Sequence, residues 1–572
     1  MLYCYLFEAK SIQSYLFKTG KLKDVIAASE RLDLLVDDTS NSVLANVMAQ
    51  LNDQFSHDLD GVDNQKDIQF LRCKGGAFYA FSENEAPLKA LRNLWTLTVQ
   101  QLFPSLEFCD ALVSGSSLQT AMKTGHQQLA ADRNQAKIKF PLAPAIANIS
   151  QRTGHAEVPA SLNAKKAGIE KDERVDLDTE LHRQAYTLLN LKEQGALQNK
   201  YTPDSDRAFS YPLNLDTDFE FVAGEYDKHA NLGEAERADL ISKKDIALVH
   251  IDGNGLGIIL RKLDAALEGV SASEYAKAFR SFSESLAKAT QTAAKEATKI
   301  VIEHGLYNQN TLAMRPLVLG GDDVTLLIRA DLAIEWSEAF CNAFKSASKS
   351  ELRQTIKLIK KNKELGKDIK EYLTASGGIL FQKSGHPFTN SHDLVEGLCK
   401  KAKALTKSID KNVGPAALSF LRLSNTATQD IDAVISQNFE VEAGHLGTLS
   451  TGLGAYLIEP DGKYASLSEL KELYRLCKHQ NTPMTLGKWR EILTHLSLGN
   501  INEANKVVER ALTLNQKGKT SLEQAFVNIS KQETSNFWYW QSDEQYVTPL
   551  SDLMVLERFS FKAQSQEKEC AE

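Results

Sequence analysis

The feature that most constrains the fold is an order of elements that occurs twice, each time around a Gly-Gly pair. In the first half, an apolar strand at residues 2–7 is followed by helical sequence and by a strand that ends at Cys73. The pair Gly75-Gly76 and a second strand come next, and a helix and a further strand complete the unit. This order, β-α-β-β-α-β, is that of the ferredoxin-like fold.

The second copy begins with residues 246–251, a continuous apolar run that is typical of a buried strand. A long region rich in Ala, Lys and Glu, residues 273–304, predicts a helix. Two short apolar strands, 316–319 and 324–328, are then joined through Gly-Gly-Asp-Asp, which predicts a hairpin. The chain is therefore predicted to be an α+β protein with two ferredoxin-like palm domains, of the kind found in nucleotide cyclases.

The remaining sequence divides around these two copies. A stretch rich in Pro, Asn, Asp and Gly separates them and predicts an irregular connecting module, whereas the end of the chain has helical spacing. We expect four parts: a first palm at 1–139, a connecting module at 140–244, a second palm at 245–412 and a mainly helical C-terminal domain at 413–572.

Charge and cysteine usage exclude several classes of protein. The net charge is −8, so no global basic field draws the chain onto nucleic acid. The seven cysteines are scattered without a C-x-x-C pair, which disfavours a zinc ribbon and a disulfide framework and suits a reducing compartment. No apolar stretch is long enough to cross a bilayer. We expect a cytoplasmic protein that makes no membrane contact.

Three carboxylates carry the predicted chemistry. Asp322 and Asp323 are adjacent at a hairpin turn and would repel each other unless a cation lies there. Asp252 ends the first strand of the same copy, and that strand lies beside the hairpin in a ferredoxin-like sheet. Two Mg²⁺ or Mn²⁺ ions about 3.5–4 Å apart can activate an attacking hydroxyl and stabilise a leaving oxygen. We predict that these aspartates are the metal ligands and catalytic groups of a metal-dependent nucleotidyltransferase.

Glycines near the carboxylates predict a nucleotide site. Gly320 and Gly321 are expected to allow turn dihedrals closed to other residues and to leave room for a nucleotide. A second glycine-rich turn follows Asp252 and leads into a helix, where backbone N–H groups can bind phosphate. Such a turn without phosphate is the commoner case in isolation, so its position beside the carboxylates is what favours binding. Its candidate residues are Gly253, Asn254, Gly255 and Gly257.

These motifs resemble a known family. Residues 252–257, 320–323, 376–379 and 402–403 resemble the second palm domain of the large subunit of type III CRISPR effector complexes, often called the CRISPR polymerase. Residues 7–13 resemble part of its first palm. The resemblance implies synthesis of cyclic oligoadenylate second messengers from ATP in antiviral defence. It also implies, as partners, guide RNA and other effector subunits bound through the palms and C-terminal helices.

Two further residues are implicated. The resemblance implies that Lys403 meets the triphosphate, although its lysine-rich helix also fits a solvated charged face. Ser376 is a candidate contact to the nucleotide, but a backbone reason for the following glycines is equally good. Asn254 can likewise be a turn residue alone.

The chain also departs from the family pattern. The first copy has Gly75-Gly76-Ala77-Phe78 in place of Gly-Gly-Asp-Asp, and Glu8 is the only acidic residue of its first strand, so this palm is predicted to be catalytically dead. The match begins with the palm and lacks the HD nuclease domain of many members, which indicates a shortened form or a stand-alone relative. Residues 151–155 contain no cysteine where relatives place zinc ligands, so we expect a module without zinc.

Two other functions remain open. A stand-alone palm cyclase could make another cyclic nucleotide, as diguanylate cyclases do. Those enzymes carry an Asn eight residues after the first-strand Asp to recognise guanine, whereas this chain has Leu260, which favours adenine. Alternatively, the two palms could form a non-catalytic scaffold that only binds nucleotide.

Overall fold

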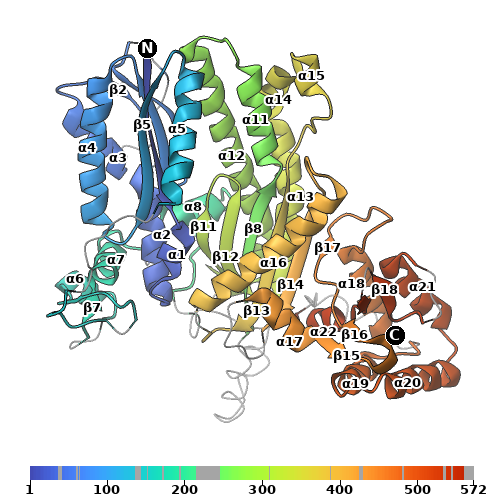
Figure 1. The fold of residues 1–572 in the computed structure, drawn as a ribbon. Coiled ribbons are helices and arrows are strands. Elements are labelled where there is room, and N and C mark those ends of the chain that lie inside the picture. Colours follow the sequence, from blue (N-terminus) through green and yellow to red (C-terminus); the bar gives the residue numbers. More distant parts are fainter. Residues whose placement is uncertain are drawn as a thin grey trace.

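The computed structural model describes most of the chain, and two palms lie side by side in it (Figure 1). It describes residues 1–559 except 37–40, 60–61, 63–64, 136–143, 151, 170–172, 192–194, 206, 214, 216–244, 308–309, 387, 424–429, 480–481, 533–535 and 543–544. The domain boundaries expected at 139–140 and 244–245 fall on or beside residues outside this part, as does the end of the C-terminal domain.

The first palm is a five-stranded sheet in the order β2-β3-β4-β1-β5. β1 lies between β4 and β5 and is antiparallel to both, which is the ferredoxin-like arrangement predicted for this copy. Its strands are β1 (Leu2–Lys10), β2 (His57–Asp58), β3 (Ile68–Lys74), β4 (Ala77–Ser82) and β5 (Glu107–Gly115). Its helices are α1 (Ile12–Phe17), α2 (Leu22–Val36), α3 (Val43–Leu51), α4 (Glu85–Leu102) and α5 (Leu118–Arg133).

The second palm has the same central arrangement in a six-stranded sheet, ordered β11-β12-β8-β13-β14-β17. The predicted hairpin is present, and β12 also pairs with the first strand, β8. The strands are β8 (Asp245–Asn254), β11 (Met314–Leu319), β12 (Asp323–Arg329), β13 (Thr374–Lys383), β14 (Ala417–Arg422) and β17 (Tyr456–Leu457). The helices are α11 (Leu256–Ala266), α12 (Ala272–His304), α13 (Ala333–Glu351), α14 (Arg353–Lys360), α15 (Lys363–Gly366) and α16 (Phe388–Ile409). Because β14 and β17 extend this sheet, the boundary expected after residue 412 divides one sheet.

Local sequence explains the two elements that frame the hairpin. The side chains of residues 245–251 in β8 are all buried, as the unbroken apolar run predicts for a central strand. The long helix α12 begins with a capping box, in which Ser271 and Glu274 satisfy each other's backbone N–H groups. Ala289, Ala293 and Ala297 lie on one face of α12 and are fully buried, so small side chains let this helix pack closely.

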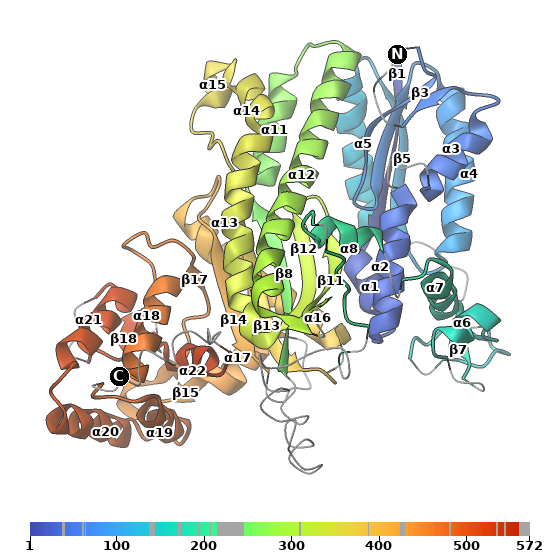
Figure 2. The same cartoon turned by 180° about the vertical axis from the view of Figure 1, so that it is seen from behind.

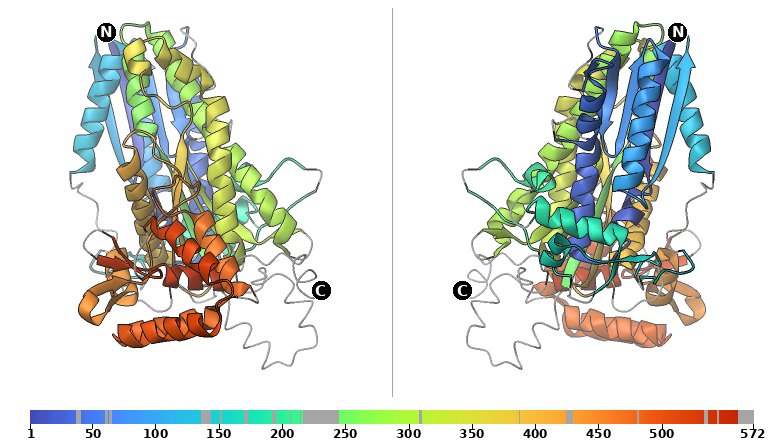
Figure 3. Two further views of the ribbon diagram at one scale, coloured as in Figure 1. Left: turned by 90° about the vertical axis from the view of Figure 1, so that its right-hand side faces the viewer. Right: turned by 90° about the vertical axis from the view of Figure 1, so that its left-hand side faces the viewer.

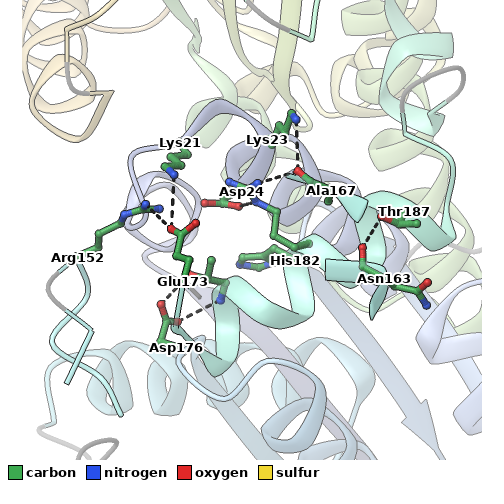
Figure 4. A network of polar contacts seen from close by, with 12 residues as sticks. Lys21, Lys23, Asp24, Arg152, Asn163, Ala167, Glu173, Asp176, His182 and Thr187 are labelled. Atoms are coloured by element: carbon green, nitrogen blue, oxygen red, sulfur yellow. Dashed lines mark hydrogen bonds and ion pairs between the residues drawn. The ribbon is translucent and has the colours of Figure 1, made fainter. Parts of the chain in front are cut away.

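The connecting module packs against helix α2 of the first palm. Its elements are β6 (Glu157–Val158), α6 (Leu162–Lys166), β7 (Val175–Asp176), α7 (Leu177–Leu188) and α8 (Ala196–Tyr201). Figure 4 shows the polar contacts that attach it. Arg183 of α7 forms a buried ion pair with Asp24 of α2, and the Lys23 ammonium donates to the Ala167 carbonyl. Removing either partner of this buried pair would leave an uncompensated charge, so the pair favours one position of α7 on α2.

The C-terminal region is mainly helical, as predicted, but it contains a small four-stranded sheet that the helical spacing did not indicate. Its helices are α17 (Ile431–Phe439), α18 (Leu467–Lys478), α19 (Leu486–Ser497), α20 (Ile501–Leu514), α21 (Lys519–Ser530) and α22 (Leu550–Phe559). Its sheet contains β15 (Glu440–Glu442), β16 (Thr448–Ser450), β18 (Trp540–Ser542) and β19 (Gln545–Val547). Figures 1 and 2 show this region beside the second palm, on the side away from the first.

The two palms meet along the edge strand β11 and the helix α12 (Figure 2), and in the side views of Figure 3 one palm lies in front of the other. Ser29 of α2 donates a hydrogen bond to the backbone carbonyl of Leu317 in β11. In the other direction, the Arg280 guanidinium of α12 donates to the carbonyls of Leu59 (2.8 Å) and Phe70 (3.3 Å). These buried contacts fix how the palms face each other. Among the described residues, no helix has both the length and the apolar character that a membrane span needs.

Candidate active site

Strand pairing brings the three predicted carboxylates to one end of the second sheet. Asp323 begins β12 directly opposite Asp252 at the end of β8. Asp322 lies next to the last residues of β8, because the Gly253 N–H donates to the Asp322 carbonyl at 3.2 Å. A Cβ atom on Gly253 would come within 2.7 Å of the Asp322 carboxylate. Glycine at this position therefore lets that side chain lie against the β8 backbone.

Burial and neighbouring carboxylates destabilise the charged forms of Asp322 and Asp323. Burial raises the pKa of Asp322 to about 7, with further contributions from the charges of Asp252 and Asp323. Burial and the charge of Asp252 likewise raise the pKa of Asp323 to about 7. One oxygen of Asp323, Oδ1, is buried and accepts no hydrogen bond. Although His250 Nδ1 approaches this oxygen to 3.3 Å, it also lies 3.0 Å from Thr325 Oγ1. Buried carboxylate oxygens with too little positive charge around them are suitable ligands for a hard divalent cation.

Close packing of helix α16 on strand β13 positions Lys403 at the site. A Cβ atom on Gly378 of β13 would lie 2.3 Å from the Val395 carbonyl of α16, so only glycine allows this approach. The Lys403 ammonium donates to Asp252 Oδ2 and, at 3.0 Å, to the Gly253 carbonyl. Lys403 is therefore part of the carboxylate cluster and not of a solvated face.

The glycines of the site differ in why they are needed. Gly255 has φ 88°, and a Cβ there would come within 2.6 Å of Val413. Gly320 and Gly321, by contrast, do not have left-handed φ, so the expected dihedral reason for them was wrong. A Cβ on either would have only ordinary contacts, of 3.6 Å or more, and on Gly257 it would meet nothing. The space beside these backbone atoms is open, and a ligand could use it, as the second reason given for these glycines requires.

Asn254 and Ser376 are buried and contact each other across neighbouring strands. The Asn254 amide donates to Ser376 Oγ at 2.8 Å and to Thr374 Oγ1 at 3.1 Å, and Ser376 is fully buried. In this conformation the two side chains link the end of β8 to the start of β13, and neither is open to a nucleotide. Asn254 is the last residue of β8 and is paired with Thr374 of β13, so its role as a turn residue or as a nucleotide contact stays a prediction.

A cavity of about 750 Å³ opens between the palms and reaches the hairpin. The second palm lines it with Gly320, Gly321 and Asp322 at one end and with Leu260 and Phe282 on its apolar wall. Basic residues that the motifs did not single out also line it: Arg72, Lys74, Lys123, Lys200 and Arg261. They come from distant segments of the chain, so a single sequence offered no signal that they converge. A volume of this size, apolar with a few charged groups, is typical of small-molecule sites.

The first palm has a different arrangement where the second has its carboxylates. Glu8 of β1 lies opposite Ala77, and its carboxylate accepts from the Tyr79 hydroxyl and pairs with the Arg133 guanidinium. The cation beside Glu8 is thus a side chain of the protein. One carboxylate that is already paired with a cation does not suit two divalent ions, and a first palm without metal stays a prediction.

A second group of possible ligand residues lies in the connecting module. His155, Asp176 and Asp178 have ligand atoms within 4.8 Å of one another. Asp176, however, caps α7 and accepts from both the N–H and the hydroxyl of Thr179, and the Lys18 ammonium lies 2.9 Å from His155 Nε2. Helix capping and a neighbouring cation therefore account for Asp176 and His155, whereas Asp178 Oδ1 is buried and accepts no hydrogen bond. The expectation of a module without zinc stays a prediction.

Comparison with known families bears on the palm that holds the carboxylates. Residues 245–412 match the family model of the Cas10/Cmr2 second palm domain. The second palm is Cas10-like. This confirms the resemblance to the type III CRISPR large subunit that the motifs indicated. No curated protein matches the chain significantly.

Several solved structures can be aligned over most of the chain at low identity. A Csm1-Csm4 cassette in complex with pppApA covers 98% of this chain and 69% of its own, with 14% identity and a TM-score of 0.47. Csm1 in T. onnurineus covers 83% and 60%, with 14% identity and a TM-score of 0.39. A Csm1-Csm4 cassette in complex with AMPPNP covers 71% and 53%, with 13% identity and a TM-score of 0.38. This chain thus spans between about half and two thirds of the length of these proteins.

Proposed function

We propose that the second palm is a metal-dependent nucleotidyltransferase that joins ATP into cyclic oligoadenylates in a CRISPR-type antiviral defence. One observation carries the proposal: Asp252, Asp322 and Asp323 converge at the end of a Cas10-like palm sheet, beside a cavity large enough for a nucleotide. Csm1-Csm4 cassettes have been solved in complex with AMPPNP, pppApA and cA4, and these are the substrate and product classes to be tested for this chain.

In this proposal the three aspartates hold two Mg²⁺ or Mn²⁺ ions. Such ions, when bound, polarise the triphosphate and lower the pKa of the attacking hydroxyl. The protein's own part is to fix the carboxylates through β8 and β12 and to present Lys403 and the basic residues of the cavity to the phosphates. The cavity's apolar wall, which includes Leu260, would receive the base.

The proposed partners follow from the same family. Guide RNA and other type III effector subunits are proposed to bind through the palms and the C-terminal helices, and the protein is proposed to act in the cytoplasm. Copurification with RNA or with a second subunit, when the chain is expressed together with its genomic neighbours, would test the assembly separately from the chemistry.

The chemical proposal is tested by product analysis. Purified protein is incubated with ATP, or with GTP, and Mn²⁺, and any oligonucleotide is identified by mass. The variant Asp322→Ala with Asp323→Ala should abolish product while retaining the fold by circular dichroism. Glu8→Gln, which changes the corresponding acidic residue of the first palm, is the matched control and should retain product. Synthesis by the double variant would refute the site, and a protein that binds nucleotide without turnover would support a scaffold.

A further inference from the structure

One hydrogen bond connects the first palm directly to a carboxylate of the second. The side-chain amide of Gln13, on α1, donates to Asp323 Oδ2 at 3.0 Å, across 310 residues of sequence. Gln13 is half-buried, and Asp323 is the first residue of β12. The orientation of this carboxylate is therefore fixed in part by a residue that does not belong to its own domain.

The glycine pair of the first palm places Gln13. Between β1 and α1 the chain turns at Ser11, a non-glycine residue with φ 53°. The first residue of α1, Ile12, then packs on the turn between β3 and β4, where a Cβ on Gly76 would lie 2.8 Å from Ile12 Cδ1. Gly76 itself has φ 71°. This turn carries no carboxylate. Its glycine instead leaves room for Ile12, and in this way it positions α1 and Gln13.

The far end of α1 is also anchored on the second palm. The Phe17 ring stacks on the His392 ring with a centroid distance of 4.8 Å and an interplanar angle of 26°. His392 belongs to α16, the helix that carries Lys403. Its ring packs edge-on against the His250 ring, with a centroid distance of 6.1 Å. With contacts at both Asp323 and α16, α1 is held in a defined position relative to the carboxylate cluster.

We propose that Gln13 is a positioning residue for the metal site of the second palm, orienting the Asp323 carboxylate for a divalent cation. This inference rests on the proposed function, in which Asp323 is a ligand. A neutral amide suits the task, because it orients a carboxylate by hydrogen bonding without competing with the metal as a cation would. Partners that orient a ligating carboxylate typically contribute about 10–100-fold to metal affinity or activity. In this arrangement the first palm, without metal ligands of its own, helps to build the metal site of the second.

The test measures Mn²⁺ binding to the full chain without nucleotide. Gln13→Met keeps the length of the side chain and removes the donor, and Ser14→Ala, at an exposed position of the same helix, is the matched control. We expect Gln13→Met to bind Mn²⁺ at least about tenfold more weakly, with Ser14→Ala like the wild type. In product formation, the Mn²⁺ concentration for half-maximal rate should rise by a similar factor while KM for ATP changes little, and excess Mn²⁺ should restore the rate. Unchanged Mn²⁺ affinity in Gln13→Met would overturn the proposal.

Loss of fold is separated from loss of positioning by a double-mutant cycle. If Gln13→Met also lowers Tm, the same change is made in the Asp323→Asn background. A destabilisation that disappears there supports the contact, whereas one of equal size shows a packing role and overturns the proposal. Wild-type protein that binds no Mn²⁺ in an Asp323-dependent way would refute the proposed function itself. Asp323-dependent binding that is insensitive to Gln13 would refute only this inference.

Discussion

The Lys403 ammonium donates hydrogen bonds to the Asp252 carboxylate and to the Gly253 carbonyl, so a protein cation lies where the proposed metal and triphosphate would meet. Lys403→Met removes this cation without shortening the side chain greatly. We expect KM for ATP to rise by about tenfold or more, because a charge-assisted hydrogen bond contributes about 1.5–3 kcal/mol. Affinity for Mn²⁺ alone should not fall, because Asp252 loses a competing partner. Steady-state kinetics and metal titration together measure the two effects.

Lys401 provides the control for that prediction. It lies on the same helix two residues earlier, but it pairs with Asp432 at 2.7 Å, away from the carboxylates. Lys401→Met should leave both KM and Mn²⁺ affinity unchanged. Equal effects of the two substitutions would show that the general positive charge of α16 matters, and that Lys403 has no particular contact with the triphosphate.

The raised pKa values of Asp322 and Asp323, both about 7, predict how stability depends on pH without metal. A carboxyl whose pKa is higher in the folded protein costs no stability below its unfolded value near 4, where it is protonated in both states. Stability is then lost as the pH rises from about 4 to about 7. In chelator at about pH 8, Asp322→Asn should therefore raise the Tm of the second palm by a few degrees, at about 2–4 °C per kcal/mol for a domain of its size. Near pH 4 the variant should match the wild type.

Metal binding should reverse the loss of stability at high pH, because the cation compensates the charges of Asp322 and Asp323. Addition of Mn²⁺ at about pH 8 should raise Tm of the wild type more than that of Asp322→Asn. Thermal unfolding with and without chelator, at both pH values, tests the pair of expectations. A wild-type Tm that is higher at pH 8 than at pH 4 in chelator, and that Asp322→Asn lowers, would contradict the origin assigned to the pKa shifts.

The fold was largely predictable because its signals are local. The apolar run of β8, the hairpin around residues 320–323 and the repeat order specify the ferredoxin-like arrangement, and that arrangement alone places Asp252 opposite Asp323. What the sequence could not show is contacts between the copies. Gln13 and Arg72 meet the second palm only after the two domains pack, and nothing in their own neighbourhoods indicates this. Likewise, the reason for Gly378 is the approach of α16, which no local pattern encodes.

The first palm should remain without metal even when a carboxylate is added. Ala77 lies opposite Glu8, as Asp323 lies opposite Asp252 in the second palm. Ala77→Asp therefore restores one predicted ligand, but Arg133 already neutralises Glu8 and no counterpart of Asp322 is present. We expect Mn²⁺ stoichiometry and product yield to match the wild type, with a modest loss of stability because Ala77 is buried. Additional bound Mn²⁺ that depends on Glu8 would contradict this.

The last prediction concerns the base, and it depends on the cavity wall. Metal, Lys403 and the basic residues are proposed to contact the triphosphate, which is the same in ATP and GTP, so discrimination must come from groups near the base. Leu260 of α11 lines the cavity and offers guanine no hydrogen-bond partner. Leaving a buried polar group of guanine unpaired costs about 1–3 kcal/mol. We therefore expect at least about tenfold preference for ATP over GTP when both compete, read as the composition of the product. Leu260→Asn adds a donor and an acceptor and should narrow this preference, whereas Leu260→Met, which keeps an apolar surface, should not. A product made mainly of guanylate, or equal incorporation by the wild type, would refute the adenylate assignment and favour a diguanylate-like cyclase.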